Sequence, residues 1–121
     1  MSNYRISLGR RGELFAAQYL ERLGYRIIEQ NFRVKCGEID IIAREDDYTV
    51  FIEVKTRSGT GFGHPAEAVT HHKQQQIIKT ALVYMSQNNL HEAPVRFDVV
   101  AVMMKKSGPP GAELIRNAFV G

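Results

Sequence analysis

Apolar residues recur at helical spacing in two segments of the chain. The first segment is residues 9–24, which Gly24 ends; its stripe begins just before it and consists of Leu8, Gly12, Phe15, Ala16, Tyr19, Leu20 and Leu23. Between about residues 67 and 87 they form a second stripe: Ile77, Ile78, Ala81, Leu82 and Met85. This spacing is typical of helices that pack one face on a core. Both segments are predicted helices, and Gln74, one turn before the second stripe, is expected to hydrogen-bond on the inward face, either to the protein or to substrate.

Alternation of apolar and polar residues predicts strands elsewhere in the chain. Strands are expected at residues 26–34, 38–44, 49–55 and 95–103, with an optional edge strand at 113–120. The loop over residues 56–66 contains three glycines but lacks the rest of a phosphate-binding motif, so it is interpreted as a flap beside a site. The order α-β-β-β-α-β predicts an α/β protein of the α+β kind, a central mixed sheet flanked by helices.

The hairpin formed by the strands at 38–44 and 49–55 carries charges on one face. If its turn is centred on residues 46–47, paired residue numbers sum to 93, so Asp40 lies opposite Glu53 and Glu38 lies opposite Lys55. Like charges in directly opposed positions destabilise a sheet. A divalent ion such as Mg²⁺ would compensate two such carboxylates, because it prefers oxygen ligands. Three apolar residues are expected on the other face of the first strand: Ile39, Ile41 and Ala43.

Length and composition indicate one soluble domain. The 121 residues are 44% hydrophobic and 24% charged, which is enough to bury a core. We expect a single domain over residues 1–121, with a core at about 5–103 and a C-terminal extension at 104–121. The one cysteine excludes an internal disulfide and fits a reducing compartment. No membrane-length apolar run or secretory signal is visible, so we expect a cytoplasmic protein that does not bind membranes.

The charge distribution favours a polyanionic partner. Residues 38–54 carry six acidic side chains and one basic side chain, whereas the segments on both sides carry net positive charge. An acidic centre between basic flanks suits a metal site that handles a polyanion. Arginine outnumbers lysine ten to six, and its guanidinium binds phosphate in a forked geometry. A basic surface that serves solubility explains the total charge equally well, but it explains the segregation less well.

The charged hairpin offers the groups that phosphodiester cleavage needs. Asp40 and Glu53 are predicted ligands of one or two Mg²⁺ or Mn²⁺ ions, with the carbonyl of Val54 as a further ligand. Lys55 either orients or deprotonates the attacking water or stabilises the transition state. Glu13 completes the acidic shell from the first helix, although a favourable contact with the helix dipole explains it equally well. The predicted nucleic-acid contacts are Arg10, Arg11, Arg57, Lys73 and Gln74.

Several motifs, in order along the chain, resemble a known family. Asp40 followed by Glu53-Val54-Lys55 resembles the PD-(D/E)xK nuclease signature. With it stand Gly-Arg-Arg-Gly-Glu-Leu-Phe-Ala-Ala (9–17), Asn-Phe-Arg (31–33), Gly-Glu-Ile-Asp (37–40), Phe-Ile-Glu-Val-Lys-Thr-Arg (51–57) and Arg-Phe-Asp-Val-Val (96–100). Together they resemble the YraN-like family of small uncharacterised bacterial proteins, which is similar to archaeal Holliday-junction resolvases. The resemblance covers roughly residues 5–103.

The resemblance implies both a fold and a chemistry. It implies a restriction-endonuclease-like fold, with Glu13, Asp40, Glu53 and Lys55 as the catalytic and metal-binding set and Gln74 as an accessory residue. The implied activity is a magnesium-dependent endonuclease that acts on DNA, with branched or damaged structures as the implied substrates.

Three alternatives stay open at the level of sequence. A non-catalytic nucleic-acid-binding or adaptor protein would keep the fold with an idle acidic cluster. The same charges would also fit a structural ion-pair network without metal, or the solvated face of an ordinary hairpin. A zinc site is disfavoured, because the four histidines lack the spacing of zinc ligands and Cys36 has no second cysteine beside it in a zinc-binding motif. The histidines are His64, His71, His72 and His91. Binding a two-armed DNA would favour a homodimer, but a monomer is equally compatible with the sequence.

Overall fold

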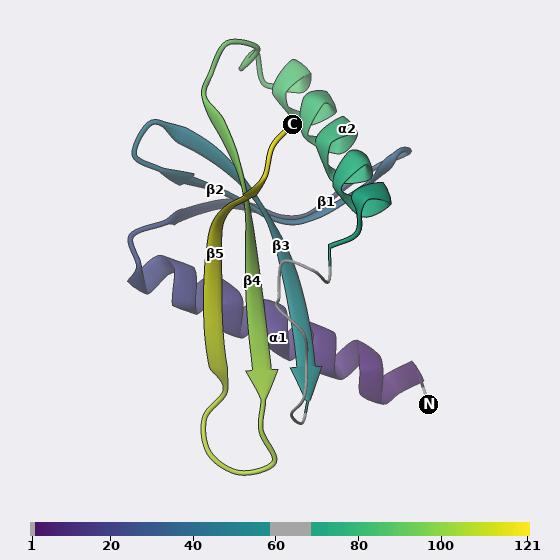
Figure 1. The fold of residues 1–121 in the computed structure, drawn as a ribbon, viewed down its shortest axis with the longest axis vertical. Helices are drawn as coiled ribbons and strands as arrows, with labels where there is room; N and C mark the ends of the chain where they lie inside the picture. The colour runs from purple at the N-terminus through teal and green to yellow at the C-terminus, as the bar shows by residue number, and fades with distance from the viewer. Residues whose placement is uncertain (1, 59–68) are drawn as a thin grey trace.

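A computed structural model describes residues 2–58 and 69–121, with side chains from residue 7 onwards (Figure 1). Its elements are helix α1 (Ser2–Arg22), strands β1 (Arg26–Val34), β2 (Gly37–Glu45) and β3 (Tyr48–Ser58), helix α2 (His71–Gln87), and strands β4 (Val95–Met104) and β5 (Gly111–Phe119). His64, most of the predicted 56–66 loop and residues 67–68 of the predicted second helix lie outside the described residues. No helix in the described part is long and apolar enough to cross a membrane.

The five strands form one mixed sheet in the order β1-β2-β3-β4-β5. Neighbouring strands are antiparallel except for β3 and β4, which are parallel. A parallel pair needs a crossover connection, and the segment between β3 and β4 contains α2. The predicted mixed α+β sheet with flanking helices, as in a restriction-endonuclease-like core, is therefore confirmed, and the optional last strand is present.

The two helices cover opposite faces of the sheet. On the α1 side, the core consists of Ala16, Ala17, Leu20, Tyr25, Ile41, Ala43, Val50, Ile52, Val100 and Val102. On the α2 side, it is richer in aromatic residues and includes Phe32, Phe51, Tyr84, Phe97 and Phe119. The middle of the sheet is buried between these two layers, which explains why β4 from Val99 to Met104 is a continuous apolar run.

The predicted element boundaries and buried faces need four corrections. Helix α1 begins at Ser2 rather than at residue 9, and α2 begins at His71, because Thr70 caps it by accepting a hydrogen bond from the Lys73 N–H. Strand β3 continues to Ser58, beyond the predicted residue 55. Leu23 and Leu82 are exposed, at 42% and 64%. Leu23 follows the last residue of α1, and Leu82 lies about 100° around α2 from the buried Ala81.

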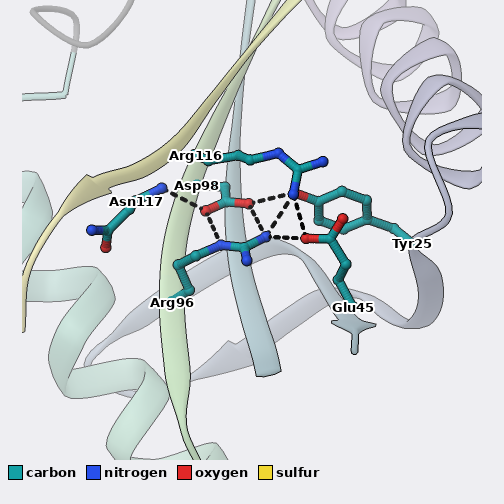
Figure 2. A network of polar contacts seen from close by, with 6 residues as sticks. All are labelled: Tyr25, Glu45, Arg96, Asp98, Arg116 and Asn117. Atoms are coloured by element: carbon teal, nitrogen blue, oxygen red, sulfur yellow. Dashed lines mark hydrogen bonds and ion pairs between the residues drawn. The ribbon is translucent and has the colours of Figure 1, made fainter. Parts of the chain in front are cut away.

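A polar network ties together the α1 side of the sheet at the β4–β5 edge (Figure 2). Asp98, which is fully buried, accepts hydrogen bonds from the Tyr25 hydroxyl at 2.8 Å and from Arg96 at 2.9 and 3.0 Å. Arg96 also contacts Glu45 at 2.6 Å, and Arg116 reaches the same Glu45 oxygen at 2.6 Å. The network contains two carboxylates and two guanidinium groups, so its charges are balanced, and each of these groups is hydrogen-bonded to another member.

Candidate functional site

Strand β2 changes its regular alternation at Asp40. Ile41 and Ala43 pack on the α1 side as predicted, but Ile39 packs on the α2 side together with Ile42, so the prediction for Ile39 is wrong. Side chains of a regular strand alternate between faces, and residues 39 and 42 cannot share a face without an irregularity between them. The irregularity lies at the residue with the first predicted metal-binding carboxylate.

The predicted hairpin register is confirmed up to this irregularity. Residues of β2 and β3 pair from Glu45–Tyr48 to Ile41–Ile52, and each pair sums to 93. The ladder ends there, and the Asp40 carboxylate accepts the Val54 N–H through Oδ2 at 2.8 Å. A side-chain oxygen thus takes the place of a ladder acceptor. It fixes the Asp40 carboxylate in the gap where the two strands separate.

The predicted opposition of Glu38 and Lys55 is wrong. Because the β2–β3 ladder ends at Ile41–Ile52, Glu38 is paired only with β1, where Arg33 is its ladder partner. Arg33 Nε lies 3.1 Å from Glu38 Oε2. Lys55 instead approaches the Glu53 carboxylate on its own strand.

Asp40 and Glu53 nevertheless form one carboxylate pair. Glu53 is only 7% exposed, and burial, followed by the charge of Asp40, raises its pKa to about 7. Burial also raises the pKa of Asp40, although the Val54 N–H bond opposes this rise. Both shifts mean that the site disfavours two negative charges in the absence of a compensating cation.

Two lysines approach the same oxygen of Glu53 from different elements. Lys55 Nζ lies 3.6 Å from Glu53 Oε2, and Lys73 Nζ, from the first turn of α2, lies 3.9 Å from it. Both amines lower the pKa of Glu53, but burial and Asp40 outweigh them. The predicted phosphate contact Lys73 therefore lies beside the carboxylate pair.

Helix α1 brings Glu13 to the same place through a close contact with β3. A Cβ at position 12 would overlap Thr56 Oγ1 and lie 2.7 Å from Thr56 Cγ2, so only glycine fits here. Burial raises the pKa of Glu13, and the charge of Asp40 raises it further. A groove of about 600 Å³ runs between α1 and the end of β3, and it is lined by Leu8, Gly9, Glu13 and residues 54–58. Glu13 and Lys55 thus line the same groove, beside the carboxylate pair of Asp40 and Glu53.

The other predicted nucleic-acid contacts lie in different surroundings. Arg57 lines the groove, and its Nη1 donates to the Thr56 carbonyl at 3.1 Å. Arg10 and Arg11 are exposed on α1. Gln74 donates through Nε2 to the Val69 carbonyl at 3.0 Å, which is a structural hydrogen bond of the kind expected on the inward face. Its contact with substrate stays a prediction.

Sequence reasoning missed Asn31, which was noted only as part of a motif. With its amide oriented to satisfy its partners, Asn31 Nδ2 donates to Glu13 Oε1 at 3.1 Å and to Glu38 Oε2 at 3.2 Å. The same pairing arithmetic would have found it, because the β1–β2 pairs from Glu29–Ile42 to Val34–Gly37 sum to 71 and place Asn31 opposite Asp40.

The donor set suits a hard divalent ion that also binds its substrate. Among the described residues, no three His, Cys, Asp or Glu side chains converge as a ready-made metal-binding group. Mg²⁺ commonly uses only one or two carboxylates and takes its remaining ligands from water and phosphate oxygens. Asp40 and Glu53 fit this pattern, because Asp40 is partly buried and Glu53 is buried. Both have raised pKa values, which a bound cation would lower. The carbonyl of Val54 stays a predicted ligand.

Comparison with known proteins assigns the chain to a family. The model of the uncharacterised protein family UPF0102 matches residues 12–102. A UPF0102 protein of Geotalea daltonii is 49% identical over 117 residues, which cover 97% of this chain and 92% of the relative. One of Rhodococcus opacus is 47% identical over 116 residues, covering 96% and 98%. One of Acetivibrio thermocellus is 46% identical over 122 residues, covering 97% and 94%. The chain therefore belongs to UPF0102, the YraN-like family that its motifs resemble.

Proposed function

We propose that this protein is a metal-dependent endonuclease that hydrolyses phosphodiester bonds of DNA. The observation that carries the proposal is the carboxylate pair, the partly buried Asp40 and the buried Glu53, at the point where β2 and β3 separate, with Lys55 Nζ 3.6 Å from Glu53. A structural role alone gives no reason to place two carboxylates together away from water, because burial raises the pKa of both groups and the charge of Asp40 raises that of Glu53 further. Perturbed pKa values in a cleft are typical of functional sites.

The ion and the chain would divide the chemistry between them. Mg²⁺ or Mn²⁺, when bound, lowers the pKa of a water ligand and neutralises charge on the phosphate. Asp40 is held in orientation by its bond to the Val54 N–H, so its carboxylate needs little reorganisation. Lys55 and Lys73 bring two positive charges to the scissile phosphate, and either charge would stabilise a transition state with increased negative charge.

Branched or damaged DNA is the substrate class that we propose. The similarity of the family to archaeal Holliday-junction resolvases supports this choice. The groove beside the carboxylate pair is lined by Lys55 and Arg57, and Arg10 and Arg11 lie exposed on α1. Such side chains bind phosphate without reading sequence, as an enzyme that recognises the shape of DNA requires.

The proposal is tested with labelled linear, flapped and four-way DNA in Mg²⁺ or Mn²⁺. We expect wild-type protein to cleave at least one of these structures. Lys55→Ala should lower the cleavage rate by roughly 10²-fold or more, while it keeps most of the DNA binding, because general acid–base or electrostatic groups contribute at that scale. Asp40→Asn and Glu53→Gln should weaken binding of the divalent ion, as measured by calorimetry with DNA present.

Lys79→Ala is the matched control, because Lys79 is an exposed residue on the same helix as Lys73 and its loss removes one positive charge away from the carboxylate pair. It should cleave DNA at close to the wild-type rate. If wild-type protein binds these DNA structures but cleaves none of them with either ion, the proposal fails. A non-catalytic DNA-binding or adaptor role then replaces it.

A further inference from the structure

Asn31 has an unusual backbone conformation for a residue inside a strand. Its φ is +55°, whereas β1 runs from Arg26 to Val34 around it. A positive φ costs an L-residue about 1 kcal/mol or more, although asparagine tolerates it better than most. Such strain persists only where the surroundings impose it, and it is found preferentially at functional sites.

The other non-glycine residues with positive φ have simple structural explanations. Among the described residues these are Asp46, Asn89 and Asn117. Asp46 lies in the β2–β3 turn, and Asn89 follows the end of α2. Asn117 donates its N–H to the Asp98 carboxylate at a register shift in β5. Asn31 is neither in a turn nor at a helix end.

The side chain of Asn31 joins two carboxylates from different elements. Nδ2 donates both its hydrogens, one to Glu13 on α1 at 3.1 Å and one to Glu38 on β2 at 3.2 Å. Because the pairs Gln30–Ile41 and Phe32–Ile39 flank it, Asn31 lies opposite Asp40. The neutral amide NH₂ of asparagine carries two donors, so it can bind two acceptors at once. Asn31 thus holds two carboxylates without adding a charge.

We propose that Asn31 is a positioning residue, which fixes the Glu13 carboxylate beside Asp40 so that it contributes to divalent-ion binding. This inference rests on the proposed metal-dependent function. Groups that orient the residues around a metal typically change its affinity 10–100-fold when they are removed. Glu38 acts as the second anchor, since Arg33 already pairs with it at 3.1 Å and holds it in place.

The test is a double-mutant cycle on Mn²⁺ affinity, measured by electron paramagnetic resonance with and without a four-way DNA. Asn31→Gly keeps a residue that adopts positive φ freely but removes the donor. We expect Asn31→Gly and Glu13→Ala each to weaken Mn²⁺ binding roughly tenfold. The double variant should lose no more than either single variant, because Asn31 acts through Glu13.

Asn89→Gly is the matched control, since it replaces an asparagine of nearly the same φ, +56°, at the opposite end of α2 from Lys73. It should leave Mn²⁺ affinity unchanged. The inference is overturned if wild-type protein binds Mn²⁺ and Asn31→Gly binds it equally well, or if the two losses multiply in the double variant. If wild-type protein itself binds no Mn²⁺ with or without DNA, the proposed function fails and this inference fails with it.

A second measurement does not depend on how the glycine variant folds. The side-chain amide resonances of Asn31 should shift in Glu13→Ala and in Glu38→Ala. They should stay in place in Glu21→Ala, which removes an exposed carboxylate from the same helix as Glu13. Unchanged resonances in the first two variants would show that the bridge does not exist, and that result overturns the inference.

Discussion

Two aspartates of this protein accept the same kind of main-chain hydrogen bond in different electrostatic surroundings. Asp40 and Asp98 each accept a main-chain N–H of a neighbouring strand, at 2.8 and 2.9 Å, where a strand ladder is interrupted. Asp98 is also bound by Arg96 and by the Tyr25 hydroxyl, so its charge is compensated. Asp40 has Glu53 as its neighbour instead, and its pKa is raised by burial. The charge of Asp98 is thus compensated by a direct ion pair with Arg96, whereas Asp40 lies beside a second carboxylate.

Replacing Glu53 by glutamine should stabilise the protein at high pH. Its pKa rises from 4.5 to about 7 on folding, so the folded state binds the proton more tightly than the unfolded state. The resulting penalty is absent below pH 4.5, grows as the pH rises and is complete above pH 7. In urea unfolding without divalent ions, Glu53→Gln should gain roughly 1–3 kcal/mol at pH 8, and less than half of that at pH 5.

Glu45→Gln provides the control of opposite sign. Burial alone would raise the pKa of Glu45, but hydrogen bonds from Arg96 and Arg116 outweigh it and lower the pKa below 4.5. The stability from this group is therefore present above the unfolded pKa and is lost as the pH falls through the folded pKa. Glu45→Gln should destabilise the protein to a similar extent at pH 5 and pH 8. A loss of stability in Glu53→Gln at pH 8 would contradict the assignment of a strained carboxylate pair.

At the scale of elements, periodicity was sufficient wherever main-chain hydrogen bonding is regular. The strands and the β2–β3 register follow from alternation and from the centre of one turn, and both are confirmed. The prediction failed for Ile39, which packs on the α2 side next to Asp40, where a side-chain acceptor takes the place of a ladder bond. The alternation of apolar and polar residues does not reveal where a side-chain oxygen replaces a main-chain acceptor. The contacts of Asn31 and the Gly12–Thr56 approach depend on tertiary packing, which single-segment patterns do not contain.

Helix α1 should lose its position over the site when Gly12 becomes alanine. The new Cβ would overlap Thr56 Oγ1 and lie 2.8 Å from Thr56 Cβ, so α1 has to move away from β3 and take Glu13 with it. Overpacking of this kind costs roughly 1–3 kcal/mol, more than the gain of up to about 1 kcal/mol that alanine brings to a helix. We expect Gly12→Ala to lower the free energy of unfolding in urea and to weaken Mn²⁺ binding.

Gly9→Ala isolates the contribution of helix propensity. Gly9 belongs to the same helix and lines the same groove, but a Cβ there would meet no atom within 4 Å. This variant should be more stable than wild type by about 0.5–1 kcal/mol and should bind Mn²⁺ normally. Equal effects of the two substitutions would mean that the α1–β3 contact does not set the position of Glu13.

Across the whole molecule, stability and the proposed chemistry lie at different ends of β2. Glu45, which joins the polar network in Figure 2, is five residues along β2 from Asp40, a separation of about 16 Å at ~3.3 Å per residue. The network is charge-balanced and links Tyr25, β2, β4 and β5. The carboxylate pair is unbalanced and lies where β2 and β3 have already separated. Acidic charges are thus fully compensated around Glu45 and incompletely compensated around Asp40 and Glu53.

Arg96→Ala should therefore destabilise the fold without changing the ion site. Its side chain is 14% exposed and pairs with the fully buried Asp98, which would be left as an unpaired buried charge. Breaking such a pair costs roughly 3–5 kcal/mol. Arg116→Ala removes a 48% exposed guanidinium from the same Glu45 and should cost at most about 1 kcal/mol. Urea unfolding measures both costs, and Mn²⁺ titration at a temperature where both variants stay folded should give the wild-type affinity. A folded Arg96→Ala that had lost Mn²⁺ binding would show instead that the network at one end of β2 holds the carboxylate pair at the other.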